Sequence, residues 1–224
     1  MPAEPQPSAS GVPVVYVVYV DNAFVVLNKP SGMLSVPGRG PEKQDCLSSR
    51  VQTLFADALV VHRLDMATSG LLVMARGAVV QRRLNGAFAQ REVHKRYVAW
   101  VSGLLETPGD DWREIDLPII VDWPNRPLRV IDHQRGQSSV TRLRALQSDP
   151  TRNRTLVELE PVTGRSHQLR VHLQAIGHPI LGDALYAPQA VAAMASRLQL
   201  HASNLAFAHP VTGVLVRFEC NADF

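Results

Sequence analysis

The segment VVHRLDMATSGLLVMAR, residues 60–76, places a polar loop between two apolar runs that are typical of β-strands. Asp65 lies in that loop. A carboxylate held between two buried strands is unfavourable unless it is paired or hydrogen-bonded. The spacing leaves two interpretations open: Asp65 is a functional carboxylate, or it is structural and caps a turn formed by Thr68, Ser69 and Gly70.

Short apolar runs separated by turn residues predict ten strands, at residues 14–20, 24–28, 59–61, 71–75, 97–101, 119–121, 140–146, 155–159, 205–208 and 214–218. Helices are expected at residues 46–56, 79–90, 166–176 and 191–198. Ser166 is expected to cap the third helix, and Gly177 to end it. Many strands without a repeating βαβ pattern predict the α+β class, with an extended mixed, mostly antiparallel β-sheet and flanking helices.

The chain has 224 residues, 46% of them apolar, which is typical of one large globular domain or two small ones. Residues 1–13 are rich in Pro, Ala and Ser, so we expect a flexible tail followed by one domain over residues 14–224. No apolar run reaches about eighteen residues and no signal peptide is evident, so a cytoplasmic location without a membrane span is expected. Cys46 and Cys220 belong to no CxxC pair, which argues against a cysteine zinc site.

Positive charge is concentrated in the middle of the chain. Residues 1–121 hold 12 basic and 12 acidic side chains, residues 122–172 hold 9 and 5, and residues 173–224 hold 2 and 3. All nine basic residues of the middle segment are arginines, whose planar guanidinium groups suit phosphates and base edges. A contact with a polyanion is one interpretation. Composition alone favours a solvated arginine-rich surface at least equally.

Motifs for nucleotide, metal or serine chemistry are missing from the sequence. It contains no phosphate-binding GxxxxGK[ST] loop, no GxGxxG after a strand, no GxSxG and no HExxH. We therefore expect no cofactor and no metal, and any catalysis would use ordinary side chains. A reaction without net gain or loss of atoms fits this best.

Three further segments place polar residues where packing alone does not require them. On the expected helix in residues 161–183, Arg170 either points into a cleft or faces solvent, as arginines on amphipathic helices often do. In KRYVAWVSG, residues 95–103, Tyr97 opens the expected strand, and such a tyrosine is usually in the core. Residues 200–213 are typical of scaffold, with a strand leading into a His-Pro turn.

Together these segments resemble the RluA-type pseudouridine synthases. The likeness rests on HRLDMATSG (residues 62–70), NKPSGMLSVPG (28–38), the strand that contains Tyr97, and TGRSHQLRVHLQAIGHPILGDALY (163–186), and it spans residues 16–224. LPIIVDWPNRP, residues 117–127, is further similar to the short branch of that family, which modifies both a 23S rRNA loop and the tRNA anticodon stem-loop. The resemblance implies the pseudouridine synthase fold, with a central active-site cleft.

The resemblance also implies the chemistry and the site. Uridine in RNA becomes pseudouridine: the N–C glycosidic bond breaks, the uracil rotates and a C–C bond forms. Asp65 matches the catalytic aspartate, Arg170 the arginine that pairs with it and keeps it ionised, and Tyr97 the tyrosine whose ring lies against the base. Arg63 matches the residue that enters the RNA when the target nucleotide flips out. The remaining expected substrate-binding residues are His62, Leu64, Thr68, Arg165, Leu181, Arg126 and Arg129.

Two departures from the family pattern concern RNA recognition. Only a short Pro-rich stretch precedes Val14 in this sequence, so we expect no S4-type RNA-binding domain, and we expect the arginines of residues 122–172, among them Arg126, Arg129 and Arg144, to contact phosphates. Gln137 and Ser139 stand where the family usually has lysine and a small apolar residue, so the backbone contact made there is expected to differ.

The expected partners are the tRNA anticodon stem-loop and 23S rRNA, with no membrane, and the expected state is a monomer. The alternatives are a pseudouridine synthase acting on another rRNA site, a non-catalytic RNA-binding protein with the same fold, and a hydrolase in which Asp183 is a second carboxylate.

Overall fold

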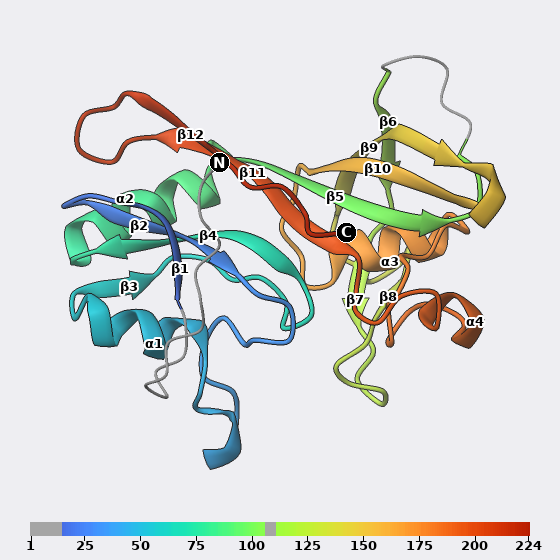
Figure 1. Cartoon of the computed structure of the whole chain (residues 1–224), viewed down its shortest axis with the longest axis horizontal. Coiled ribbons are helices and arrows are strands. Elements are labelled where there is room, and N and C mark those ends of the chain that lie inside the picture. The colour runs from blue at the N-terminus through green and yellow to red at the C-terminus, as the bar shows by residue number, and fades with distance from the viewer. Residues whose placement is uncertain (1–14, 106–110) are drawn as a thin grey trace.

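A computed structural model describes residues 15–105 and 111–224 (Figure 1). The tail predicted at residues 1–13 lies outside the described residues. The strands are β1 (Tyr16–Val20), β2 (Phe24–Lys29), β3 (Ala58–Val60), β4 (Ser69–Arg76), β5 (His94–Ser102), β6 (Arg113–Asp116), β7 (Ile119–Val121), β8 (Arg129–Ile131), β9 (Val140–Asp149), β10 (Arg154–Pro161), β11 (Leu200–Ala208) and β12 (Leu215–Glu219). The α-helices are α1 (Leu47–Leu54), α2 (Ala78–Ala89), α3 (Gln168–Ala175) and α4 (Gln189–Ala192), and the 3₁₀ helices are η1 (Pro41–Lys43) and η2 (Pro150–Arg152).

Ten of the strands form one sheet. Its order is β1-β2-β4-β11-β5-β10-β9-β6, with β12 paired to β11 and β3 to β4, while β7 and β8 form a separate hairpin. The β4–β11 pair is parallel and the other described pairs are antiparallel. The predicted α+β class with a mixed, mostly antiparallel sheet is therefore confirmed.

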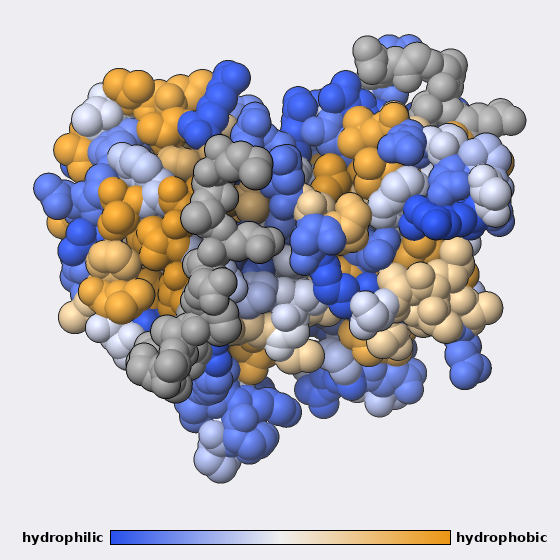
Figure 2. Space-filling model, in the orientation of Figure 1, coloured by the Kyte–Doolittle hydropathy of each residue, from blue (hydrophilic) through white to orange (hydrophobic). Residues whose placement is uncertain are grey.

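The sheet carries a helical layer in each of two halves (Figure 1). One half contains β1 to β4 with α1 and α2, the other contains β6, β9 and β10 with α3, and β5 and β11 run between them. Each half has its own buried apolar clusters, and Tyr97 packs against a cluster of each half. Figure 2 shows apolar side chains gathered over the half that contains β1, all of whose residues are exposed.

The centre of the sheet requires a glycine. Gly70 pairs with Ala202 of β11, and Ala202 pairs in turn with Tyr97 of β5. Gly70 has φ +111°, and a Cβ atom there would overlap the backbone of Ala202. The glycine of the TSG motif therefore permits the close approach that places the loop before β4 beside Tyr97.

Most of the predicted helices and strands are present, but several begin or end at other residues than predicted. Helix α2 is present where a helix was predicted at residues 79–90, and its Leu84 is buried in the core. The prediction that Ser166 caps α3 is wrong: the residue before the helix is His167, and its side chain makes no capping hydrogen bond. Strand β5 begins three residues before Tyr97, and α4 has four residues where eight were expected. Strands β6 and β8 were not predicted, because both are short and carry charged residues.

Two other expectations concern the cysteines and the membrane. Cys46 is buried and Cys220 is partly buried, and neither forms a disulfide within the described residues. In residues 15–105 and 111–224, no helix is long and apolar enough to cross a membrane.

Candidate active site

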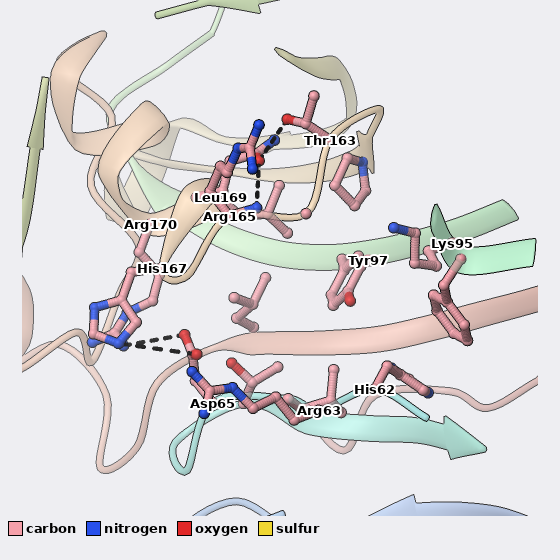
Figure 3. Close-up of a pocket in the computed structure, with 17 residues that line it drawn as sticks. His62, Arg63, Asp65, Lys95, Tyr97, Thr163, Arg165, His167, Leu169 and Arg170 are labelled. Atoms are coloured by element: carbon pink, nitrogen blue, oxygen red, sulfur yellow. Dashed lines mark hydrogen bonds and ion pairs between the residues drawn. The ribbon is translucent and has the colours of Figure 1, made fainter. Parts of the chain in front are cut away.

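A cavity of about 310 Å³ lies where the two halves meet (Figure 3). Three segments supply most of its lining: the loop between β3 and β4, strand β5, and the segment that leads from the end of β10 into α3; Phe88 of α2 and Leu200 of β11 complete it. Its lining residues are His62, Arg63, Leu64, Asp65, Thr68, Phe88, Lys95, Tyr97, Pro161, Thr163, Gly164, Arg165, His167, Gln168, Leu169, Arg170 and Leu200. Eight of the residues expected from the sequence therefore come together, from segments about a hundred residues apart.

A buried lysine holds the loop that carries Asp65. Lys29 is fully buried, and its Nζ donates hydrogen bonds to the carbonyls of Pro30 (2.8 Å), Met33 (2.8 Å) and Met66 (3.0 Å). Burial lowers the pKa of Lys29 to about 8, against the opposing influence of the Asp65 charge. This ammonium joins the NKPSG loop to the residue that follows Asp65.

Two serines complete this support. Ser35 Oγ donates to the carbonyl of Leu64 (2.7 Å) and accepts from the Leu64 amide (3.1 Å). Ser31 Oγ donates to the carbonyl of Ala67 (2.7 Å). The backbone on both sides of Asp65 is thus fixed by side chains from the loop after β2, which leaves the carboxylate to face the cavity.

Asp65 does not cap a turn with its side chain. The turn is closed by its backbone carbonyl, which accepts from the Thr68 amide at 3.1 Å. Its carboxylate is 26% exposed, with Oδ2 3.5 Å from Arg170 Nη1 and Oδ1 3.9 Å from His167 Nε2 (Figure 3). The structural interpretation of Asp65 is therefore wrong, and the carboxylate is available for chemistry.

Arg170 is buried and does not face solvent, contrary to one of the two interpretations of the helix. Its Nε and Nη2 donate to Asp183 Oδ2 (2.8 Å) and Oδ1 (2.6 Å), so its remaining nitrogen, Nη1, is the one directed at Asp65. Asp183 is almost fully buried and also accepts from the amides of Leu185 and Tyr186. This aspartate orients the arginine, and it is not accessible as the second carboxylate of a hydrolase.

Tyr97 forms the floor of the cavity in the middle of β5 (Figure 3). Burial, and then the negative charge of Asp65, raise the pKa of Tyr97 well above its usual value. The phenol is therefore neutral near pH 7 and presents a flat apolar ring with a hydroxyl that still carries its proton.

His62 forms a neutral wall opposite α3. Its Nε2 accepts a hydrogen bond from the Val73 amide (3.0 Å), and its ring stacks on Phe88 with the centroids 4.5 Å apart. Burial and the neighbouring Lys95 charge lower the pKa of His62 to about 3. The imidazole therefore supplies shape rather than a proton.

The turn before α3 is held by Gln168. Its Oε1 accepts from Thr163 Oγ1 (2.7 Å) and from the Arg165 amide (3.0 Å), and its Nε2 donates to the Val140 carbonyl (2.9 Å). Arg165 is exposed at the edge of the cavity, and Arg63 is exposed on the opposite side. The two guanidinium groups therefore flank the entrance.

Three of the expected residues lie outside the cavity. Leu181 is buried in the scaffold, where its amide donates to Trp100 and its carbonyl accepts from Gln199, so the expectation that it lines the pocket is wrong. Arg126 and Arg129 belong to the β7–β8 hairpin, which projects from the body of the molecule in Figure 1.

Most of the arginines in the basic middle segment have carboxylate partners. Six of the nine form ion pairs: Arg135, Arg142, Arg144, Arg152, Arg154 and Arg170. The expected phosphate contact of Arg144 is therefore not supported, because its guanidinium lies 2.7 Å from Glu158. Arg126, Arg129 and Arg165 have no carboxylate partner among residues 15–105 and 111–224.

The departures at Gln137 and Ser139 lie at the base of the same hairpin. Gln137 exchanges both backbone hydrogen bonds with Ile119 (3.0 and 2.9 Å), and the buried Ser139 donates through Oγ to the Gln137 carbonyl (2.8 Å). The substituted side chains thus leave this backbone pairing in place.

Sequence reasoning did not assign roles to Lys29, Lys95, His167 or Tyr186. Lysine usage was an available signal: the chain has 20 arginines and 3 lysines, and two of those lysines lie in or beneath the cavity. His167 and Tyr186 meet only in the folded chain, so no spacing rule could pair them.

Comparison with known proteins shows the family to which the chain belongs. The profile of the RNA pseudouridylate synthase family matches residues 23–175. The chain belongs to this family. It is therefore an isomerase that converts uridine in RNA into pseudouridine.

Individual family members are similar over nearly the whole chain. The dual-specificity RNA pseudouridine synthase RluA of Yersinia pestis is 50% identical over 208 residues, which are 93% of this chain and 99% of that protein. The protein of the same description from Escherichia coli strain K12 is 45% identical over 95% of both chains. The structure of human RNA pseudouridylate synthase domain containing 1 superposes with a TM-score of 0.77 at 26% identity, and covers 98% of this chain and 87% of its own.

Proposed function

We propose that this pseudouridine synthase acts on two RNAs, the tRNA anticodon stem-loop and a loop of 23S rRNA, in the cytoplasm where both occur. The observation that carries the proposal is 50% identity across essentially the full length of an enzyme described as dual-specificity. The segment at residues 117–127, which resembles the short branch of the family, forms most of the projecting β7–β8 hairpin.

Asp65 is the catalytic group of the proposal. Its carboxylate is the acidic group among the residues that line the described cavity, and Arg170 balances its charge. In the overall reaction the bond from uracil N1 to ribose C1′ breaks, a bond from C5 to C1′ forms, C5 gives up a proton and N1 gains one. Each role open to Asp65, addition to the sugar or the base or removal of a sugar proton, requires the ionised carboxylate beside the bound ring.

Tyr97 and His62 would hold the detached uracil while it turns. The Tyr97 ring and the His62–Phe88 stack face the cavity from β5 and from the loop before β4, and neither ring is charged near neutral pH. Flat neutral walls bind a uracil in more than one orientation, which the rotation demands. Leu64 and Thr68 close the same side of the cavity.

The cavity is enclosed by both halves of the sheet, so a base must leave its stack to enter it. Arg63 at the entrance is placed to take the position of the extruded base, and Arg165 to bind the adjoining phosphate. Arg126, which stacks on Trp123 at 4.4 Å, and Arg129 would contact the RNA backbone farther out. Loops with unstacked bases are the RNA elements that such sites recognise.

Pseudouridine mapping tests this proposal directly. The purified protein is incubated with an anticodon stem-loop RNA and with 23S rRNA lacking modifications, and pseudouridines are located by chemical mapping. We expect one new site in each RNA with the wild-type protein and none with Asp65→Asn. A wild-type protein that modifies neither RNA would refute the proposed specificity, and an active Asp65→Asn protein would refute the proposed chemistry.

A further inference from the structure

His167 is held in a backbone conformation that histidine seldom adopts. It has φ 59° and ψ 12°, in the left-handed region, immediately before α3. Strained residues of this kind cluster at functional sites, where the fold maintains them. The conformation directs the imidazole into the space between Asp65 and Tyr186. Figure 3 shows the ring beside the Asp65 carboxylate.

The hydrogen bonds around the ring determine which nitrogen carries its proton. Tyr186 Oη accepts from the Arg129 amide (3.0 Å) and lies 2.6 Å from His167 Nδ1. If Nδ1 carried the proton, the Nε2 lone pair would face the Asp65 carboxylate. The favourable arrangement has Tyr186 donating to Nδ1, which places the ring proton on Nε2, 3.9 Å from Asp65 Oδ1.

Burial and the nearby cations keep the ring neutral. Burial lowers the pKa of His167 below its ordinary value, and the Arg170 and Arg129 charges act in the same direction, whereas Asp65 and Asp183 oppose the shift. The Arg170 guanidinium also lies over the Tyr186 ring, 5.0 Å from its centroid. A protonated imidazole would thus add a further cation beside Arg170.

These groups lie in a row from the β7–β8 hairpin to the Asp65 carboxylate. The row runs from the Arg129 amide of β8 through the Tyr186 hydroxyl and the His167 ring to Asp65. The last separation is longer than a hydrogen bond, and such contacts often close only when substrate is bound.

We propose that His167 is a positioning residue that holds Asp65 through its Nε2–H, with its tautomer set by Tyr186 and, through Tyr186, by the β7–β8 hairpin. The inference rests on the proposed role of Asp65. It adds a link by which engagement of RNA at the hairpin orients the carboxylate in the cavity.

Two replacements of His167 separate this role from a structural one. The amide nitrogen of Gln occupies nearly the place of Nε2, whereas that of Asn lies near Nδ1 and does not reach Asp65. Asn tolerates the left-handed conformation better than Gln does. A structural role therefore predicts that His167→Gln is the worse variant, and the positioning role predicts that His167→Asn is.

The test is single-turnover pseudouridine formation on the anticodon stem-loop RNA, with the rate constant at saturating enzyme and the apparent Kd measured separately. We expect His167→Asn to lower the rate constant about tenfold with little change in Kd, and His167→Gln to recover most of that loss. His178→Asn is the matched control, because His178 lies beyond the far end of α3, bonded to the Ser102 carbonyl and outside the cavity. We expect it to leave the rate constant within about twofold.

Tyr186→Phe tests the tautomer step, because it removes the hydroxyl and leaves the ring over Arg170. It should lower the rate constant, and the double variant with His167→Asn should be no slower than His167→Asn alone, since both changes interrupt one path. Independent, multiplicative losses, or an Asn variant as fast as the Gln variant, would overturn the inference. A wild-type protein inactive on the RNA would instead overturn the proposed function.

Discussion

The buried pair between Arg170 and Asp183 makes Asp183→Asn an informative substitution. The side chains are 5% and 1% exposed, and the bidentate contact has bonds of 2.8 and 2.6 Å. Asn preserves the shape of the side chain but removes its charge, which leaves a buried guanidinium without its closest counter-ion. Breaking one partner of such a pair costs about 3–5 kcal/mol.

A chain of this size loses roughly 2–4 °C of Tm for each kcal/mol, so a fall of about 6–20 °C is expected. Asp65 is then the remaining carboxylate near Arg170, with Oδ2 already 3.5 Å from Nη1. The freed guanidinium should move toward Asp65 and occupy it, so the rate of pseudouridine formation should fall as well.

Circular dichroism during heating measures the Tm, and during urea denaturation it measures the free energy of unfolding. Single-turnover kinetics at a temperature where the variant is folded measures the rate of pseudouridine formation. Asp45→Asn is the matched control, because Asp45 makes the same bidentate contact with Arg50 (2.6 and 2.5 Å) on the surface. Solvent screening should make its loss hard to detect. A free energy of unfolding within about 1 kcal/mol of wild type in Asp183→Asn would refute the reasoning, since it would mean that the buried pair adds no more than a surface pair does.

Three further predictions follow from the site and the hairpin. Asp65→Asn should abolish pseudouridine formation yet keep the wild-type Tm and RNA affinity, because no side-chain hydrogen bond of the described fold depends on this carboxylate; a matching loss of Tm would contradict this. The pKa of His62 in the folded protein is about 3, so between about pH 6.5 and 3 the unfolded state binds one more proton than the folded state. The free energy of unfolding should therefore decrease as the pH is lowered from about 6.5 to 3. His62→Gln should make urea-derived stability less steep over that range, and an unchanged slope would contradict the assignment. Arg126→Ala should weaken RNA binding and reduce the slope of log affinity against log salt by about 0.7–0.9, measured by fluorescence anisotropy, whereas an unchanged slope would exclude a phosphate contact.

Local elements with a strong periodic pattern could be predicted from the sequence. Strand β2, strand β4 and helix α2 appear close to their expected places, because each has an apolar run or stripe that is buried. Strand β1 also appears near its expected place, although all of its residues are exposed, because its backbone pairs with β2. Strands β6 and β8 have no such pattern and exist through pairing with β9 and β7. Their backbone hydrogen bonds stabilise them where side-chain preference does not.

Some residues of the candidate site could likewise be predicted from the sequence, and others could not. Asp65, Tyr97, Arg170 and Arg63 could be named from motifs, since each motif keeps its residues in one order along the chain. The contacts of Asp183 and His167 could not be predicted, because they depend on which side chains meet across the fold. The phosphate contact expected for Arg144 rested only on the number of arginines in residues 122–172. In the structure Arg144 pairs with Glu158 on the neighbouring strand, which neutralises its charge.

The sequence by itself determined the family, the reaction and the loop that carries the Asp65 carboxylate, because covalent order preserves motif spacing and the hydrophobic pattern indicates most of the strands. Only the tertiary structure decided how that carboxylate is surrounded: Lys29 beneath its loop, Arg170 oriented by Asp183, and His167 set by Tyr186. Buried charges need partners at bonding distance, and those partners come from distant segments that pairing of β4, β11 and β5 brings together.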